Sequence, residues 1–160
     1  MPVINIQHQR GVLLLEILIT VVILSVGLLG LAAMQLQGTQ SNHSAYLRSQ
    51  ASFLSYDILD RMRSNRSLAL NMSSYAINMG DPAPTSTTNC AAANCNSSEM
   101  ALFDMSEWKQ ATASILPSGN GEIFFTAAAA GSPIVNINIQ WQDSRKTNAP
   151  LHNFIFRAEL

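Results

Sequence analysis

The residues that could take part in chemistry lie near the N-terminal end of the sequence. Gly11 follows a short polar stretch and directly precedes a long apolar run, and the acid Glu16 lies inside that run. Cleavage after Gly11 would make Val12 the new N-terminal residue and Glu16 the fifth residue, one helical turn from the new α-amino group. An unpaired carboxylate among apolar helices is costly, and a positive amine offsets that cost. The spacing therefore favours processing that keeps the apolar segment.

The apolar run is long enough to cross a membrane. Between Val12 and Met34, 18 of 23 residues are apolar and Glu16 is the single charge. A helix of that length spans roughly 34 Å, against a bilayer core of about 30 Å. Arg10 lies just before the run, and the next basic residue is Arg48. This asymmetry predicts one membrane pass, with a cytoplasmic N-terminus and an exported C-terminal part.

A conventional secretory signal peptide is the competing interpretation. Gly30, Leu31 and Ala32 form a small-x-small cleavage site, so a cut after Ala32 would release a secreted domain. A signal peptide gains nothing from an acid such as Glu16. Inserting an acid costs about 2.5–3.5 kcal/mol at a helix centre and less toward its end. An ionisable residue inside a membrane segment is therefore a candidate functional residue.

Composition limits the remaining possibilities. The 160 residues suit one domain of ordinary size, and only 12% of them are charged. Outside 12–34, Leu, Ile, Val and Phe make up 28 of 137 residues, so this part of the chain has few large apolar residues with which to form a hydrophobic core. A typical cytosolic enzyme and a multi-span membrane protein are both excluded. The net charge is −1, so the basic footprint of a nucleic-acid-binding protein is absent.

Two cysteines, Cys90 and Cys95, have four residues between them and lie in a polar stretch. Two thiols cannot complete a structural zinc site, and His43 and His152 show no ligand spacing relative to them. A disulfide-closed loop in an oxidising compartment is favoured, and two free thiols are the alternative. The sequence contains no catalytic motif. We therefore expect no enzyme activity, no metal and no cofactor.

The periodicity of apolar residues predicts the secondary structure. A helix is expected from about residue 12 to about 67, because five apolar residues recur at helical spacing after the membrane segment. A second helix is expected at 98–116, and its candidates for packing in the core are Leu102, Phe103, Met105, Trp108 and Leu116. Strands are expected at 122–127, 134–141 and 153–160. Apolar and polar residues alternate in the second strand, and Trp141 at its end is expected in the core. These elements predict an α+β fold in which a long N-terminal helix packs against an antiparallel sheet of about three to four strands. The five apolar residues of the helix stripe are Leu47, Ala51, Leu54, Ile58 and Met62.

The segment from Gly11 to Glu16 and the apolar run after it resemble the class III signal of type IV prepilins and type II secretion pseudopilins. The resemblance implies a prepilin peptidase that cuts after Gly11 and methylates the amine of Val12. Val12 departs from the Phe or Met usual in that position. It also implies that Glu16 pairs with the N-terminus of a neighbouring subunit during assembly. The implied regions are a leader at 1–11, a transmembrane half-helix at 12–34, a periplasmic half-helix at 35–67 and a head at 68–160.

A narrower resemblance covers about residues 10–66. The runs 44–51, Ser-Ala-Tyr-Leu-Arg-Ser-Gln-Ala, and 56–65, Tyr-Asp-Ile-Leu-Asp-Arg-Met-Arg-Ser-Asn, are similar to those of the minor pilins called type IV pilus modification protein PilV. This implies a bacterial inner-membrane subunit with a periplasmic head that later enters the pilus fibre. The implied partners are other minor pilins, the major pilin and the assembly platform, with roles in priming, adhesion and twitching motility. A type II secretion pseudopilin is the alternative.

Overall fold

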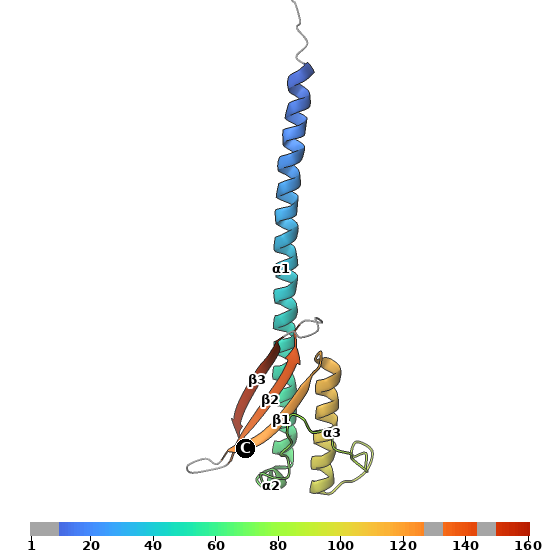
Figure 1. Ribbon diagram of the computed structural model, residues 1–160. Helices are drawn as coiled ribbons and strands as arrows, with labels where there is room; N and C mark the ends of the chain where they lie inside the picture. The colour runs from blue at the N-terminus through green and yellow to red at the C-terminus, as the bar shows by residue number, and fades with distance from the viewer. Residues whose placement is uncertain (1–9, 127–132, 144–149) are drawn as a thin grey trace, which may run out of the picture. The chain divides into compact units, whose positions relative to one another are not determined.

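A computed structural model describes residues 10–126, 133–143 and 150–160, and for 10–12 it describes the backbone alone. The chain divides into two compact units, Met1–Asn42 and His43–Leu160. The first helix contributes to both units. The elements in chain order are α1 (Arg10–Ser64), α2 (Arg66–Ala69), α3 (Ser97–Ile115), β1 (Asn120–Thr126), β2 (Ile134–Gln142) and β3 (Leu151–Glu159) (Figure 1).

The described strands form one antiparallel sheet with the order β1-β2-β3. In its central row, Ile137 of β2 lies between Ile123 of β1 and Phe156 of β3. Each predicted strand is present, with ends shifted by at most two residues. The outer edge of β1 is closed at one point, where Ile77 and Ile123 exchange two backbone hydrogen bonds of 3.0 and 2.9 Å. These findings confirm the α+β fold and give the sheet three strands.

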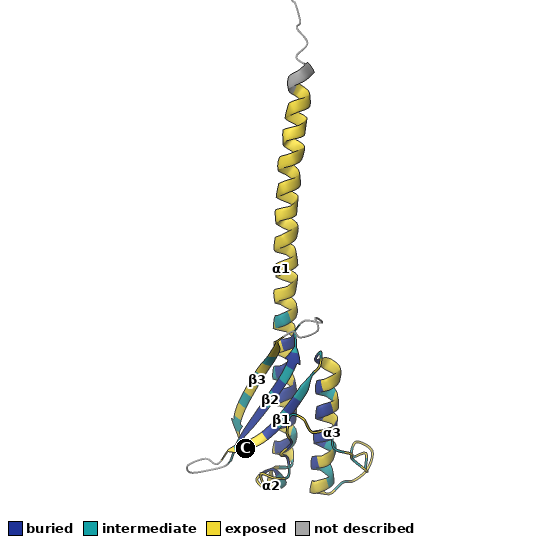
Figure 2. Cartoon of the chain, in the orientation of Figure 1, coloured by how far each residue is buried: buried dark blue, intermediate teal, exposed yellow. Residues whose placement is uncertain are grey.

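The core lies between the sheet and the part of α1 that belongs to the second unit. All five residues of the predicted helix stripe, from Leu47 to Met62, are buried there (Figure 2). Val135, Ile137, Ile139 and Trp141 are the inward-facing residues of β2, and all four are buried. The apolar face of the helix, with its period of 3.6 residues, thus packs against the apolar face of the strand, with its period of 2. Trp141 is a core residue, as predicted.

α3 supplies a third layer of the core. Met105, Trp108 and Leu116 are buried, as predicted, but Leu102 is 42% exposed and Phe103 is only half-buried. The prediction for Leu102 was wrong although Met105, Ser106 and Lys109, which lie three, four and seven residues further along the same side of α3, are buried, so spacing alone did not show that Leu102 would stay uncovered. The Trp108 indole N–H donates to the Leu54 carbonyl oxygen at 3.0 Å, which joins α3 to α1.

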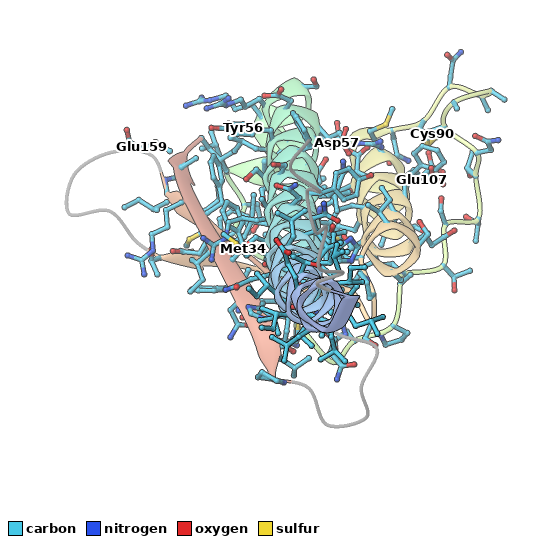
Figure 3. The ribbon with its side chains drawn as sticks, turned by 90° about the horizontal axis from the view of Figure 1, so that it is seen from above. Met34, Tyr56, Asp57, Cys90, Glu107 and Glu159 are labelled. Atoms are coloured by element: carbon cyan, nitrogen blue, oxygen red, sulfur yellow. A yellow bond between two sulfur atoms is a disulfide. The ribbon has the colours of Figure 1, made fainter. Side chains whose placement is uncertain are left out.

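α1 also borders the sheet on the side of β3. The ring of Tyr56, which is labelled in Figure 3, lies edge-on to that of Phe156, with the centroids 4.8 Å apart. Tyr56 is nevertheless 52% exposed, and Phe53, one turn earlier, is 66% exposed. This part of α1 therefore has an apolar stripe in the core and a second group of aromatic residues on its outer surface.

The first helix ends earlier than the sequence predicts. α1 stops at Ser64, and the short α2 starts at Arg66 after a break at Asn65. The Asn65 backbone leaves the helical region, at φ −110° and ψ 40°. Its side-chain amide donates to the Ser97 carbonyl at 2.7 Å and to the Tyr75 hydroxyl at 3.2 Å. These contacts with residues distant in sequence override the local preference for one helix through residue 67.

Candidate functional site

The first candidate site is the N-terminal end of α1. Gly11 and Val12 lie in its first turn, so the predicted cleavage point falls where the helix begins. The side chain of Val12 and residues 1–9 of the predicted leader lie outside the described residues. Glu16 follows Val12 by four residues, which places it one helical turn further along α1. The structure thus keeps the expected spacing between a new N-terminus at Val12 and the acid.

The surface around Glu16 is almost wholly apolar. Every large hydrophobic residue from Leu13 to Leu36 is exposed, with exposed fractions between 47% and 75%. An 18-residue window of this helix has a mean hydropathy of 2.7 and is not buried at all within the chain. By length and composition it could cross a membrane. An apolar surface of this extent needs lipid or other helices to cover it.

The other polar side chains of this segment bond to their own helix. The Thr20 hydroxyl donates to the Ile17 carbonyl at 2.8 Å, and the Ser25 hydroxyl donates to the Val21 carbonyl at 2.6 Å. Such bonds let Thr and Ser remain in an apolar environment. Among the described residues, Glu16 makes no ion pair or hydrogen bond. It is therefore the polar group of the segment that requires a partner from outside the described chain.

A second candidate site is a polar network in the second unit. Arg61 bonds Asp57 on its own helix at 3.0 Å, as the four-residue spacing predicts, and also reaches the buried Asp104 of α3 at 3.4 Å. The Tyr75 hydroxyl donates to the other oxygen of Asp104 at 2.8 Å. Asn65 donates to the same hydroxyl. The network thus joins α1, α3 and the segment after α2.

Burial sets the electrostatics of this network. It raises the pKa of Asp104 above its usual value, although the hydrogen bonds from Tyr75 and Arg61 oppose that shift. Burial likewise raises the pKa of Tyr75, so its hydroxyl keeps the proton that it donates. With its oxygens bonded from two sides, Asp104 lacks the free geometry of a general base. The bonds of the network therefore hold α1, α3 and the segment after α2 together.

These contacts also bear on the polar run at 44–65, whose role the sequence left open. Arg61 and Asn65 contact residues of the second unit that lie outside α1. Tyr46 and Arg48, by contrast, are exposed to solvent. Within this run, the polar side chains of Arg61 and Asn65 thus fix the fold, whereas those of Tyr46 and Arg48 lie on the surface.

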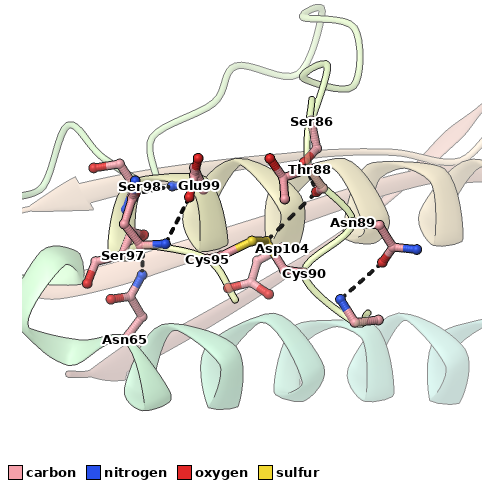
Figure 4. Close-up of a disulfide and its surroundings, with 12 residues drawn as sticks. Asn65, Ser86, Thr88, Asn89, Cys90, Cys95, Ser97, Ser98, Glu99 and Asp104 are labelled. Atoms are coloured by element: carbon pink, nitrogen blue, oxygen red, sulfur yellow. Dashed lines mark hydrogen bonds between the residues drawn. A yellow bond between two sulfur atoms is a disulfide. The ribbon is translucent and has the colours of Figure 1, made fainter. Parts of the chain in front are cut away.

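Cys90 and Cys95 form the predicted disulfide, with their Cα atoms 5.5 Å apart (Figure 4). The bond closes the loop directly before Asn96, the N-cap of α3. The Asn96 side chain accepts from the backbone N–H of Ser98 and Glu99, and the Glu99 carboxylate accepts from the Asn96 N–H at 2.9 Å. Such a reciprocal capping box satisfies the free donors of a helix start. The disulfide thus anchors the beginning of α3.

Lys109 is a buried residue that the sequence reasoning missed. Its ammonium donates to the carbonyls of Asn78 and Met79 and to the side chain of Asn120, at 2.8 to 3.2 Å. Burial lowers its pKa from the ordinary lysine value, and the nearby acids Asp81 and Glu122 oppose this shift. Its position directly after Trp108, on the side of α3 that faces the core, could have indicated its burial from the sequence. Since all three protons are used in bonds, it is a structural residue.

Two of the three histidines lie among the described residues. His152 stacks on Trp141 with ring centroids 6.0 Å apart, and His43 is exposed on α1. Within the described ranges, no three residues among His, Cys, Asp and Glu are grouped so that they could hold a metal ion.

Comparison with known sequences gives one result. The family model described as Tt1218-like, type IV pilin Tt1218, matches residues 33–106. The matched range contains the second half of α1, the disulfide loop and the first part of α3. No curated protein and no solved structure matches the chain.

Proposed function

We propose that this chain is a type IV pilin, as its match to the Tt1218-like type IV pilin family over residues 33–106 supports, and that it is a minor pilin of a type IV pilus. Pilins are structural proteins, so the proposal implies no enzyme activity. The observation that carries the proposal is the exposed apolar part of α1 with Glu16 as its single charge, in a chain with the family's sequence pattern. Such a surface suits a subunit that is stored in a membrane and later packed among other helices.

The proposed maturation begins at Gly11. A prepilin peptidase cuts after this residue on the cytoplasmic side and methylates the amine of Val12. The position of both residues in the first turn of α1 supports this step, because cleavage there leaves the apolar helix intact. The subunit then waits in the bacterial inner membrane, with its N-terminus cytoplasmic and its head periplasmic. An oxidising periplasm suits the Cys90–Cys95 disulfide.

Glu16 is proposed to guide assembly. When α1 leaves the lipid and packs among neighbouring helices, its carboxylate pairs with the positive N-terminus of an adjacent subunit. The pair offsets the cost of burying the charge and fixes the axial stagger between the two helices. The lack of any partner for Glu16 among the described residues supports this role.

The proposal extends to a PilV-type minor pilin. The polar runs at 44–51 and 56–65 support this assignment and lie within the range matched by the family. The partners would be other minor pilins, the major pilin and the inner-membrane assembly platform. The subunit would help to prime pilus assembly, and through the fibre it would contribute to adhesion and twitching motility.

Two measurements test the proposal. N-terminal sequencing of the mature protein should begin at Val12, whereas a start at Ala33 would show a conventional secreted domain. In cells that make the pilus, Glu16→Ala should leave the mature protein in the membrane but lower its amount in sheared fibres at least tenfold. Thr20→Ala is the matched control, because this hydroxyl bonds within its own helix. Normal entry of Glu16→Ala into fibres would refute the assembly role.

A further inference from the structure

The open edge of β3 is a surface that the proposed function does not use. β1 and β3 are the two edge strands of the sheet. The edge of β1 is closed at Ile123 by its backbone bonds to Ile77. β3 pairs with β2 over nine consecutive residues without a bulge, and no described residue pairs with its other edge. β3 is therefore a long, regular strand with one side free.

The register shows which backbone groups point to that side. Ile77 and Ile123 exchange both backbone bonds, so the N–H and C=O of Ile123 point away from β2. Backbone direction alternates along a strand, and consequently Ile137 of β2 points toward β3 and pairs there with Phe156. The even-numbered residues of β3 therefore bond to β2. The odd-numbered residues, from Leu151 to Glu159, present their N–H and C=O groups at the open edge.

This edge has few of the features that usually prevent pairing. Soluble proteins protect edge strands with charged side chains, lysine above all, or with proline, bulges or a covering element. β3 contains no proline, bulge or lysine, and its two charged residues, Arg157 and Glu159, lie near one end. The other side chains that flank its free backbone groups include Leu151 and Ile155, which are 49% and 54% exposed. On the inner side, the exposed ring of Tyr56 lies against Phe156 next to this strand. A further strand would find backbone partners and an aromatic surface for its inward side chains.

We propose that the β3 edge accepts an extended amphipathic strand from a different protein of the pilus assembly. Its inward apolar side chains would contact Tyr56 and Phe156. Arg157 is exposed and makes no ion pair with any described residue, so an acid on the outward face of the added strand would complement it. Main-chain bonds give such strand addition its affinity, and alternate side chains give it specificity.

A second copy of this chain is a poorer occupant. Antiparallel pairing of two β3 edges has a two-fold axis perpendicular to the sheet, which would reverse the direction of the α1 segment packed on it. This inference rests on the proposed function, in which neighbouring subunits of one fibre carry this segment in the same direction. Side-by-side stacking would bring β3 against the β1 edge of the next copy. The backbone groups of Ile123 at that edge are already bonded to Ile77. The geometry therefore points to a different protein.

The substitution Ile155→Pro should change the free edge of β3 and leave the fold of the sheet unchanged. The N–H of Ile155 points outward, so proline removes one donor from the free edge without breaking a bond to β2. Ile155→Val is the matched control, since it retains the N–H and the apolar side chain. Both full-length variants in detergent should give the near-ultraviolet circular dichroism of the original protein.

The first test measures amide hydrogen exchange of the full chain in detergent micelles. The probe is a blocked nine-residue peptide that alternates valine and threonine, with one threonine replaced by glutamate. At millimolar peptide, the amides of Asn153, Ile155 and Arg157 should exchange at least tenfold more slowly, while those of Phe154 and Phe156 should change little. Ile155→Pro should abolish the effect and Ile155→Val should keep it. Unchanged exchange at the outward amides would overturn the proposal.

The second test follows both variants in cells. Ile155→Pro should reach the membrane at the normal level yet fall at least tenfold in sheared pili, while Ile155→Val should enter normally. Normal entry of Ile155→Pro would overturn the proposal, and so would a dimer of the full chain in detergent that Ile155→Pro dissociates. If the unaltered chain is absent from pili, the proposed function fails, whereas the peptide experiment still reports on the edge.

Discussion

Gly121→Ala tests how tightly α3 and the sheet are packed. A Cβ atom at this position would lie 2.4 Å from Cη2 and 2.9 Å from Cζ2 of Trp108. Carbon atoms in good contact are about 3.5–4.0 Å apart, so the ring or the strand must move by about 1 Å. The ring is fully buried, and its N–H is bonded to the Leu54 carbonyl. Neither partner can give way without losing other contacts.

The expected cost follows from these constraints. Overpacking a core by one methyl group costs about 1–3 kcal/mol, and loss of the indole hydrogen bond adds about 1 kcal/mol. Gly121→Ala should therefore lower the free energy of unfolding by about 2–4 kcal/mol. For a chain of this size, that corresponds to a fall in Tm of about 10 °C. Near-ultraviolet circular dichroism of the full chain in detergent, which reports on Trp108 and Trp141, measures the transition.

Two control variants make the test specific. Gly80→Ala adds the same methyl group where nothing lies within 4 Å, so its Tm should change by no more than about 2 °C. Trp108→Phe shortens the ring, so adding Gly121→Ala to it should cost at least about 1 kcal/mol less than adding it to the original protein. A Tm for Gly121→Ala within 2 °C of that for Gly80→Ala would refute this account of the packing.

Two further predictions concern the head. Replacing Cys90 and Cys95 by serine should destabilise the protein by less than about 3 kcal/mol, because the loop is shorter than the 15 residues for which that value is expected. The same change should speed amide hydrogen exchange in the first turn of α3. Unchanged exchange there would show that the disulfide does not stabilise the start of α3. The raised pKa of Asp104 means that the folded state holds a proton more tightly than the unfolded state. Its contribution is therefore fully present below about pH 3.8, the ordinary value, and declines as pH rises through the raised pKa. Denaturant unfolding from pH 3 to 8 should show this decline relative to Asp104→Asn, and parallel profiles would contradict it.

Much of the fold follows from local sequence pattern. The stripe from Leu47 to Met62 predicted the buried face of α1 because each residue is spaced by one helical turn. The alternation from Ile134 to Trp141 predicted β2 and its inner face for the corresponding reason. The spacing of the two cysteines indicated the disulfide that the structure contains. Each of these features depends on residues close together in the chain.

Other features depend on contacts between distant residues. Arg61 bonds Asp104, 43 positions away, and Trp108 bonds the backbone of α1, 54 positions away. Lys109 is buried because three acceptors from two other segments surround its ammonium. Periodicity shows which face of an element is apolar, but it does not show which element will cover that face. Leu102 was misplaced for this reason.

The sequence by itself determined the candidate assembly segment: Gly11, Val12 and Glu16 are related by covalent spacing along one helix, and no folding is needed to bring them together. Only the tertiary structure decided which strand edge has no pairing partner among the described residues. The free edge of β3 becomes visible once the sheet order and register are known, because the direction of each backbone group depends on its pairing across the sheet. A strand sequence is the same whether its second edge is paired or open.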